Sequence, residues 1–464
     1  MTAVVIIGGG PGGYEAALVG RQLGADVTLI DSDGVGGSAV LTDCVPSKTL
    51  IATANVMNAT AESGSLGVMI DGQEAAGHLL SVNMATVNSR VKALACSQSE
   101  DIHSRLVAEG VRIVRGKGRL NGTNSVLVAA PDGDERTFRA DTVLIATGAR
   151  PRQLADAMPD GERILNWEQL YELNTLPERL IVVGSGVTGA EFASAYHGLG
   201  SRVVLISSRD RVLPGEDSDA AAVIEEVFAR RGLEVIARAR AVSARRVGDG
   251  VVVSLEDGRQ IQGSHVLMAV GSIPNTEHLG LAGAGVDTNS AGFIRVDRVS
   301  RTSARGVYAA GDCTGTLMLA SVAAMQGRIA MWHALGDAVQ PLDRHLVSST
   351  VFTNPEIATV GLTQKDFDEG TFRGDVIIWP LGTNPRAKMQ EQHDGFVKIM
   401  CRRGSRLIAG AVVVGASASE LIHVLSVAIH QRMTVDELAS AFTVYPSLSG
   451  SIAEAARRLH VHSE

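Results

Sequence analysis

Cysteine, aromatic residues and charge are all scarce in this chain of 464 residues. Its four cysteines are widely spaced and form no CxxC pair, so neither a disulfide framework nor a cysteine-rich zinc site is expected. The cysteines are Cys44, Cys96, Cys313 and Cys401. The twelve histidines show no spacing typical of metal ligands, so the sequence predicts no bound metal.

Basic patches and long apolar runs are missing as well. The formal net charge is −8, and no lysine-rich run or aromatic-interleaved basic patch is present, which argues against a general nucleic-acid surface. The longest apolar runs are strand-sized and interrupted by glycine, so no membrane-spanning helix is expected. The first predicted strand begins within three residues of Met1, which leaves no room for a secretory signal and predicts a cytoplasmic protein.

Glycine, by contrast, is abundant and marks a duplicated unit. Residues 4–31 and 181–207 each read as an apolar strand, a Gly-x-Gly-x-x-Gly turn, a helix ending in Leu-Gly, and a second apolar strand. Such glycines allow a tight turn, close approach of the backbone to a pyrophosphate, and close packing of helix on strand. The glycines are Gly8, Gly10 and Gly13 in the first copy, and Gly184, Gly186 and Gly189 in the second. Two copies predict two dinucleotides on one chain, with electrons passing between them.

The end of the second strand distinguishes the two predicted sites. Asp31 follows Gly8 by 23 residues and is placed to accept a hydrogen bond from a ribose hydroxyl, as in FAD or NAD sites. Ser207 stands at the same distance from Gly184, so the second site lacks the carboxylate that would repel a 2′-phosphate. The residues that follow it are Ser208, Arg209 and Arg211. We expect these cations to admit NADP; the alternative is that they only solvate a loop.

The predicted fold class is α/β, with two Rossmann-like three-layer dinucleotide-binding domains and a C-terminal α+β domain. The predicted domains are residues 1–150 with 271–340, residues 151–270, and residues 341–464. A long helix is expected over 84–109, where apolar residues recur at helical spacing. These residues are Met84, Val87, Val91, Leu94 and Ala95. The phrases VLIATGARPR and VLMAVGSIPNT predict two crossings between the first two domains.

An ordered set of motifs over nearly the full length resembles the flavoprotein disulfide reductases, most closely the lipoamide dehydrogenases. The motifs are GGGPGG at 8–13, GGSAVLTDCVPSK at 36–48, ATG at 146–148, GSGVTGAE at 184–191, VGSIPNT at 270–276, AAGD at 309–312, NPEIATVG at 354–361 and ELI at 420–422. The resemblance implies FAD in the first site, NADH or NADPH in the second, and a C-terminal domain that forms a homodimer.

The resemblance also implies which residues bind the cofactors. Those expected to bind FAD are Gly8, Gly10, Pro11, Gly12, Gly13, Asp31, Gly37, Ser38, Lys48, Lys117, Gly118, Ala146, Thr147, Gly148, Asp312, Leu319 and Ala320. Those expected at the nicotinamide dinucleotide are Gly184, Gly186, Val187, Thr188, Gly189, Glu191, Ser207, Ser208, Arg209, Val242 and Gly271.

Four residues are candidates for catalysis: Lys48, Glu191, Cys44 and Tyr445. Lys48 resembles the family lysine beside flavin N5, and Glu191 resembles its ion-pair partner near the nicotinamide. An alternative for Glu191 is a first-turn carboxylate favoured by the helix dipole, since Glu15 occupies the same place in the first copy. Val187 stands where many relatives carry a tyrosine that covers the flavin, which predicts a more open nicotinamide pocket.

Two departures from the family pattern bear on the reaction. The first cysteine of the redox motif is replaced by Ala39, and a dithiol–disulfide relay needs two sulfurs. In place of the C-terminal His-Pro and its glutamate stand Tyr445-Pro446 and Gly450, and a phenol of pKa about 10 is a poor base near neutrality. We therefore expect no lipoamide or other disulfide reduction.

Cys44 remains at the position that lies against the flavin ring in the relatives. It is either an inert thiol packed on the isoalloxazine or a redox-active thiol that passes through sulfenic acid. The preceding Asp43 should disfavour its thiolate form.

The function expected from these residues is transfer of hydride from NAD(P)H through flavin to a small acceptor, with a quinone as the best candidate. Tyr445 of the partner subunit is expected to donate a hydrogen bond there. The alternatives are a pyridine nucleotide transhydrogenase and a non-catalytic redox-sensing flavoprotein.

Overall fold

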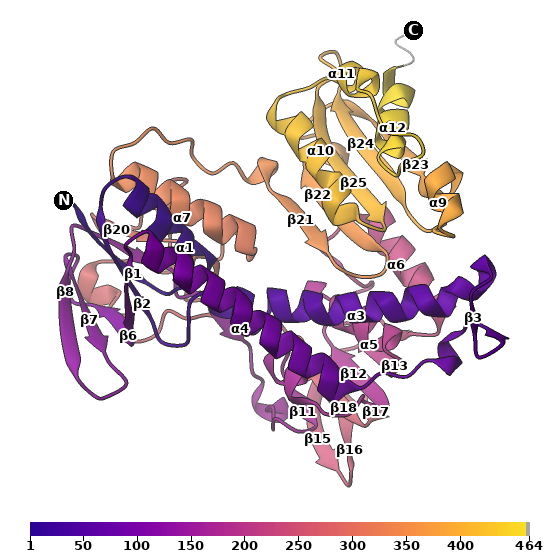
Figure 1. Cartoon of the computed structure of the whole chain (residues 1–464), viewed down its shortest axis with the longest axis horizontal. Helices are drawn as coiled ribbons and strands as arrows, with labels where there is room; N and C mark the ends of the chain where they lie inside the picture. Colours follow the sequence, from indigo (N-terminus) through magenta and orange to yellow (C-terminus); the bar gives the residue numbers. More distant parts are fainter. Residues whose placement is uncertain (461–464) are drawn as a thin grey trace.

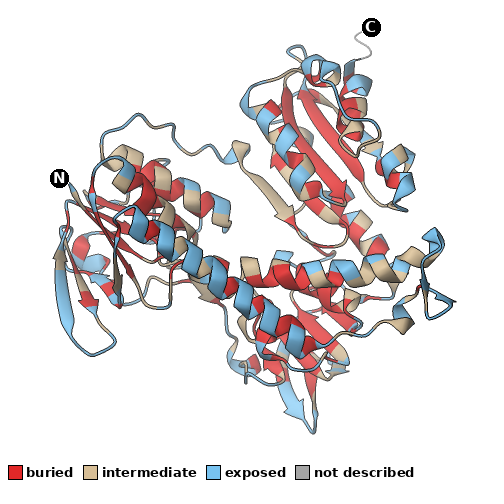
Figure 2. Cartoon of the chain, viewed as in Figure 1, coloured by how far each residue is buried: buried red, intermediate tan, exposed pale blue. Residues whose placement is uncertain are grey.

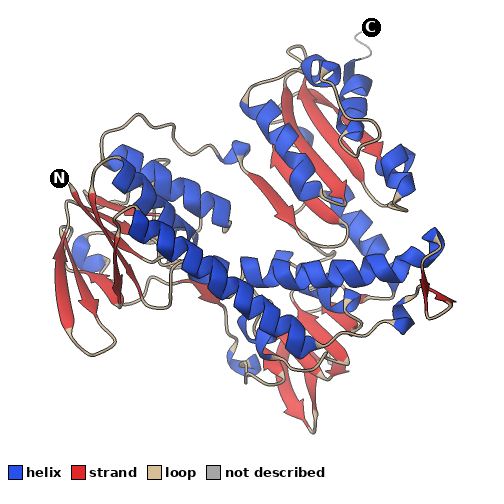
Figure 3. Cartoon of the chain, viewed as in Figure 1, coloured by secondary structure: helices blue, strands red, loops and turns tan. Residues whose placement is uncertain are grey.

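The computed structural model describes residues 1–460. The first unit is built on a five-stranded parallel sheet, with helices packed beside it (Figures 1 and 3). Its strands, in spatial order, are β20 (Val307–Ala309), β9 (Thr142–Ile145), β1 (Ala3–Ile7), β2 (Asp26–Asp31) and β5 (Arg112–Arg115). Helix α1 (Pro11–Gln22) crosses α7 (Ala320–Ala334) so closely that a Cβ at Gly327 would lie 2.1 Å from the Gly12 carbonyl oxygen.

The second unit repeats this arrangement with its own parallel sheet. Its strands, in order, are β11 (Ile164–Leu165), β18 (His265–Met268), β12 (Arg179–Val183), β13 (Arg202–Ile206) and β14 (Glu234–Ile236). Its helices are α5 (Val187–Gly198) and α6 (Ser218–Arg231). Each unit also carries a three-stranded antiparallel sheet: β6 (Lys117–Leu120), β7 (Ser125–Ala129) and β8 (Glu135–Arg139); β15 (Ala241–Val247), β16 (Gly250–Leu255) and β17 (Gln260–Gly263). The predicted α/β class is confirmed.

The two glycine turns match in atomic detail. Gly8 and Gly184 have φ values of +107° and +111°, a region that L side chains rarely adopt. A Cβ at Gly13 would lie 1.9 Å from the Gly8 carbonyl oxygen, and one at Gly189 would lie 1.8 Å from that of Gly184. Glycine is therefore required at both ends of each turn, and the predicted strand–turn–helix unit is confirmed in both copies.

Two chain segments cross between the units side by side. Strand β10 (Ala149–Pro151) pairs antiparallel with β19 (Ser272–Pro274). Next to them, the Thr147 hydroxyl donates to the Asn275 carbonyl at 2.7 Å, and the Asn275 side-chain amide donates to the Thr147 carbonyl at 3.0 Å. Beyond β19 the chain contributes β20 to the first sheet.

Two long helices connect the units (Figure 1). They are α3 (Cys44–Glu62), preceded by the short α2 (Gly37–Leu41), and α4 (Met84–Ala108); the small hairpin of β3 (Met69–Ile70) and β4 (Gln73–Glu74) lies between them in the chain. The predicted helix over 84–109 is confirmed, and four of its five apolar residues are buried. Leu94 is the exception, because it is 44% exposed.

The C-terminal domain is an antiparallel sheet with helices against it. Its strands, in order, are β21 (Ser348–Val351), β22 (Glu356–Gly361), β25 (Ile408–Gly415), β24 (Phe396–Arg402) and β23 (Gly374–Pro380). Its helices are α8 (Gln364–Asp368), α9 (Pro385–Met389), α10 (Ala418–His430), α11 (Val435–Ser440) and α12 (Gly450–His460). Every residue of β25 is buried (Figure 2). Across the described part of the chain, no helix is both long enough and apolar enough to span a bilayer.

A buried lysine ties this domain to the second unit. Lys398 on β24 is fully buried, and its Nζ lies 2.8 Å from carboxylate oxygens of both Asp217 and Asp219. Asp217 also caps α6 by accepting hydrogen bonds from the Asp219 and Ala220 amides. The ion pair therefore fixes the start of α6, and with it the loop that follows β13.

Replacing this lysine tests its contribution. Lys398→Met should lower the free energy of unfolding by about 3–5 kcal/mol, because it leaves the buried Asp217 carboxylate without a counter-charge. The shift in urea midpoint, followed by circular dichroism, measures the effect. Lys365→Met is the control, since the exposed Lys365–Glu369 pair should be worth no more than about 1 kcal/mol. Equal midpoints for both variants would contradict the assignment.

Candidate functional site

There is open space beside the first glycine turn, next to the backbone of Gly10 and Gly148. A Cβ added at Gly10 would meet only the Gly37 Cα, at 3.9 Å, and one added at Gly148 would meet nothing. The Asp31 carboxylate is held in place by the Gly9 amide at 2.6 Å, and also by the Asp33 and Gly34 amides. One of its oxygens accepts a single bond, which leaves a lone pair for a ribose hydroxyl.

A second carboxyl group, that of Asp312, lies just beyond β20 and has free hydrogen-bonding capacity. Burial, and then the charge of Asp43, raise the pKa of Asp312 to about 6. No group among residues 1–460 hydrogen-bonds to its side chain. The neighbouring Gly311 amide is bound by Gln326 of α7 at 2.8 Å, and α7 begins at Ala320 after Leu319. A carboxyl group without a protein partner in this position is suited to accept hydrogen bonds from the hydroxyl groups of a bound cofactor.

The remaining residues predicted for FAD are also on or beside the first sheet. Gly118 packs against β1, where a Cβ would lie 3.1 Å from the Ile7 side chain, and Lys117 beside it is exposed. Ala146 is buried at the end of β9. Gly37 opens α2 and touches Gly10, so α1 and α2 begin side by side.

Lys48 and Glu191 meet between the two units. The Lys48 Nζ lies 2.8 Å from Glu191, which is buried and accepts a second hydrogen bond at 2.9 Å from the Phe352 amide. The ammonium also lies 5.0 Å from the centre of the Phe352 ring. Burial alone would lower the pKa of Lys48, but the Glu191 carboxylate outweighs it and the pKa lies above its usual value. Lys48 therefore keeps its positive charge.

The equivalent residue in the first copy behaves differently. Glu15 pairs with Arg328 of α7 at 2.9 Å, with both side chains partly exposed. Glu191 is therefore more than a first-turn carboxylate, because it is buried in a contact of three chain segments.

Cys44 opens α3 next to this pair. Burial and the neighbouring Asp43 charge raise the pKa of its thiol to about 12, against a lowering effect of Lys48. The expectation that Asp43 disfavours the thiolate is confirmed. All four cysteines are free, and Cys313 and Cys401 are buried in other parts of the fold. The geometry offers Cys44 no second thiol.

The second glycine turn is open to solvent. A Cβ at Gly186 or at Gly271 would meet nothing within 4 Å, and Val187 at the start of α5 is 42% exposed. Thr188 is half-buried on the first turn of the same helix. The backbone here is accessible to a phosphate in the same way as in the first turn.

Ser207 does not project into this opening. It is fully buried, with its hydroxyl 2.7 Å from that of Ser185 and accepting a bond from the Arg209 amide at 3.1 Å. Ser207 therefore affects a bound dinucleotide only by leaving the end of β13 without a charge. The next two residues, Ser208 and Arg209, are exposed. No carboxylate of residues 1–460 forms an ion pair with Arg209 or Arg211.

Two predicted residues lie apart from these groups. Val242 is 47% exposed on β15, where the pairing with β16 is irregular, in the antiparallel sheet of the second unit. Tyr445 lies between α11 and α12 and is 82% exposed, next to the equally exposed Phe442 and Val444. Within one chain, Tyr445 reaches neither nucleotide turn.

The family models and relatives agree with this geometry. A model described as pyridine nucleotide-disulphide oxidoreductase matches residues 2–327, and its dimerisation domain matches residues 347–456. The chain belongs to the pyridine nucleotide-disulphide oxidoreductase family. An NAD(P)H dehydrogenase (quinone) from Mycobacterium tuberculosis is 52% identical, over 100% of this chain and 95% of that protein. A dihydrolipoyl dehydrogenase from Haloferax volcanii is 34% identical, over 98% of this chain and 95% of that protein.

Solved structures show the same architecture. The crystal structure of LpdA from Mycobacterium tuberculosis has a TM-score of 0.94 at 51% identity and covers 99% of this chain, and this chain covers all of it. The flavoprotein disulfide reductase RclA from Escherichia coli, at 23% identity, shares the fold with a TM-score of 0.86 and coverage of 98% and 99%. This member of the oxidoreductase family thus keeps the full-length architecture while lacking the paired cysteine.

Sequence reasoning missed two contacts of this oxidoreductase. Phe352 supplies an amide to Glu191 and a ring to Lys48, and Lys398 anchors α6. Both come from the C-terminal domain, far along the chain from their partners. Within the sequence, the signals were a phenylalanine directly after a strand, in the stretch Val-Phe-Thr-Asn-Pro, and a lysine inside an apolar strand.

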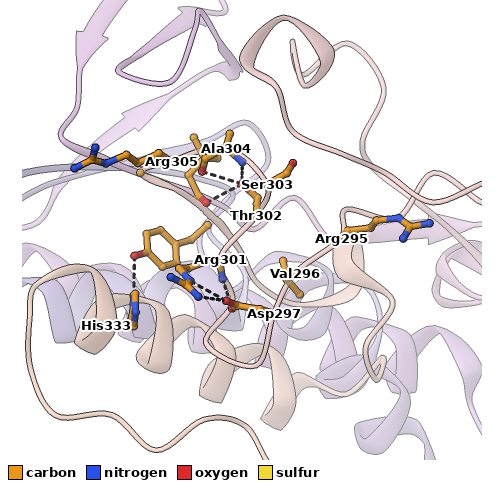
Figure 4. A pocket seen from close by; sticks show the side chains of 12 residues that line it. Arg295, Val296, Asp297, Arg301, Thr302, Ser303, Ala304, Arg305 and His333 are labelled. Atoms are coloured by element: carbon orange, nitrogen blue, oxygen red, sulfur yellow. Dashed lines mark hydrogen bonds and ion pairs between the residues drawn. The ribbon is translucent and has the colours of Figure 1, made fainter.

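A cavity of about 630 Å³ lies away from both turns, along residues 295–308 and His333 (Figure 4). Its central polar groups satisfy one another: Arg301 pairs with Asp297 at 2.7 Å, and the Tyr308 hydroxyl bonds His333 at 2.9 Å. Arg295 and Arg305 point in opposite directions (Figure 4). The cavity therefore presents no convergent set of free donors.

The state of Cys44 can be tested directly. With a pKa of about 12, its thiol should resist iodoacetamide at pH 8, whereas the exposed Cys96 should be labelled. Peptide mass spectrometry of the labelled protein measures both sites in one sample. Labelling of Cys44 as fast as that of Cys96 would show that a thiolate forms near neutrality.

Proposed function

We propose that this oxidoreductase is an NAD(P)H dehydrogenase that uses FAD to reduce a quinone. The observation that carries the proposal is the intact pair of half-buried Lys48 and buried Glu191, beside a single thiol held in its protonated form. The residues needed for reducing a flavin are retained, and those needed for disulfide exchange are not. The quinone is suggested by the name of the 52% identical relative and by the need for an acceptor without sulfur chemistry.

The two glycine turns would hold the cofactors. The first turn with Asp31 and Asp312 suits FAD, and the second turn with Arg209 suits a nicotinamide dinucleotide. FAD supplies an acceptor for the hydride of NAD(P)H and then a donor for the quinone. Lys48 contributes a fixed positive charge where negative charge develops, and Glu191 keeps that ammonium in place. Glu191 is buried, whereas the Lys48 side chain is 32% exposed.

An acceptor screen tests this proposal. Purified holoenzyme should oxidise NADH or NADPH rapidly with small quinones, and slowly or not at all with lipoamide or glutathione disulfide. The absence of paired thiols is the reason, because exchange with a disulfide substrate needs two sulfurs. Lipoamide turnover comparable to the quinone rate would contradict the proposal. Rapid transfer between two nicotinamide dinucleotides would instead indicate a transhydrogenase, and flavin reduction without turnover a redox sensor.

The neutral end of β13 predicts use of NADPH. We expect kcat/KM for NADPH to be at least comparable to that for NADH, because Ser207 carries no charge and Arg209 and Arg211 have no carboxylate partner among residues 1–460. Ser208→Glu, at the exposed neighbour of buried Ser207, should lower kcat/KM for NADPH selectively, through charge repulsion. Steady-state kinetics with both dinucleotides measures the ratio, and Ser208→Gln is the matched control. A hundredfold preference of the unchanged enzyme for NADH would refute this prediction.

We also propose that the acceptor site is completed in a homodimer, where the exposed segment with Tyr445 would cover the flavin of the partner. If the hydroxyl donates to a quinone oxygen, Tyr445→Phe should lower quinone turnover about tenfold, the effect of about 1.4 kcal/mol. Flavin bleaching by NAD(P)H in anaerobic single turnovers should be unchanged. Full activity of Tyr445→Phe with several quinones would reduce the tyrosine to a packing residue.

A further inference from the structure

The loop between β13 and α6 carries the residues expected to meet the adenosine end of the nicotinamide dinucleotide. Ser208 and Arg209 on this loop are exposed. Side chains on a loop bind a ligand well when the loop is already held in one position, because ordering a mobile segment costs conformational entropy. The following inference rests on the proposed function and concerns what holds this loop.

Part of the loop is held within the second unit. The Arg209 carbonyl accepts a hydrogen bond at 2.7 Å from the Arg238 amide, which follows β14. The Leu213 amide donates to the Ser185 carbonyl at 2.8 Å, and Ser185 is the second residue of the Gly-x-Gly-x-x-Gly turn. Leu213 is buried with a φ of +52°, a region that L side chains rarely adopt. A turn of this kind persists only where surrounding contacts hold it.

The remainder of the loop is held by α6. The amide of the fully buried Val212 donates to the Glu225 carboxylate of α6 at 2.7 Å. Asp217 ends the loop and caps the helix, with one carboxylate oxygen accepting from the Asp219 amide at 3.0 Å. The loop therefore moves with α6, and whatever holds α6 also sets the position of the loop.

Lys398 holds the start of α6 from another domain. Its Nζ lies 2.8 Å from Asp217 and 2.8 Å from Asp219, and it belongs to β24 of the C-terminal domain, which lies next to α6 (Figure 1). The Lys398 side chain is fully buried, and that of Asp217 is 5% exposed. Ion pairs between exposed side chains contribute little, whereas breaking a buried pair leaves an uncompensated charge. Lys398 thereby joins the C-terminal domain to the loop through Asp217.

A second set of contacts joins the other end of α6 to the same domain. Arg230 forms an ion pair with Asp394, and Arg231 donates to the Asn354 carbonyl at 3.0 Å. The Arg230 side chain is 51% exposed. At a rise of 1.5 Å per residue, this end of the helix lies about 20 Å from its start. These contacts hold the helix but lie away from the loop, so they provide a matched comparison.

We propose that Lys398 is a positioning residue for the nicotinamide dinucleotide. By holding Asp217, it keeps α6 and the loop after β13 in the position where Ser208 and Arg209 meet the 2′-phosphate of NADPH. The C-terminal domain thus contributes to dinucleotide binding without touching the ligand. The phosphate contacts come from the loop and the pyrophosphate contacts from the glycine turn. Loss of Lys398 therefore lowers the affinity for NADPH more than that for NADH.

Binding of the oxidised dinucleotides measures this effect without turnover. In holoenzyme titrated by isothermal calorimetry, Lys398→Met should lower the ratio of NADP⁺ affinity to NAD⁺ affinity at least about fivefold, the lower end of typical coupling between separate sites. A smaller folded fraction changes the number of binding sites but not this ratio, so a loss of stability alone does not move it. In steady-state kinetics, KM for NADPH should rise while kcat stays within about twofold, because binding and not the chemical step is affected.

Two variants separate positioning from folding. Lys398→Met combined with Asp217→Asn removes both charges of the buried pair, while asparagine keeps the helix cap. This double variant should regain most of the stability that Lys398→Met loses, yet its affinity ratio should stay low because the link to the C-terminal domain is still missing. Arg230→Met breaks the ion pair at the other end of α6 and should leave the ratio unchanged.

Three outcomes would overturn the assignment. An unchanged ratio in Lys398→Met, or in the double variant if the single one does not fold, would make Lys398 a stabilising residue only. An equal fall in Arg230→Met would trace the effect to domain packing in general. Recovery of the ratio together with stability in the double variant would show that lost stability caused the fall. If the unchanged enzyme binds neither dinucleotide, the proposed function fails as well, and the acceptor screen then shows no oxidation of NADH or NADPH.

Discussion

The ion pair between half-buried Lys48 and buried Glu191 is the contact on which the site depends. It joins α3 to α5, and the Phe352 amide adds a bond from the segment leading to the C-terminal domain. Removing two charges from water is costly, and the cost is offset only when geometry and further hydrogen bonds are good. Glu191 meets this condition, with one oxygen on the ammonium and the other on the amide. The Glu191 carboxylate thereby holds α3, α5 and the segment at Phe352 in fixed positions relative to one another.

Much of the fold could be predicted because local constraints specify it. The two nucleotide units follow from glycines whose Cβ atoms would collide with backbone carbonyl oxygens, and such constraints are readable within a dozen residues. The long helix followed from its apolar spacing, with Leu94 wrongly grouped with the buried face. Periodicity alone gives the helix, but it does not say how wide the buried stripe is. The neutral end of β13 was also readable, although the inward direction of the Ser207 hydroxyl was not.

The rest of the site depends on contacts between distant segments. Phe352 lies 161 positions from Glu191, and Lys398 lies 181 positions from Asp217. No local pattern distinguishes a lysine that ends in solvent from one buried against two carboxylates, because that difference is made by the partner domain. The same holds for the pKa of Asp43, which is affected by the charge of Glu191, 148 positions along the chain.

Loss of a thiol changes what the same cleft must do with protons. When hydride goes directly to an oxygen acceptor, charge develops on that oxygen and a nearby acid becomes useful. Burial raises the pKa of the Asp43 carboxyl group above that of a free aspartate, with Lys48 opposing the shift and Glu191 adding to it. Burial and then the charge of Asp43 keep Cys44 protonated, so the one thiol at this site is a poor nucleophile.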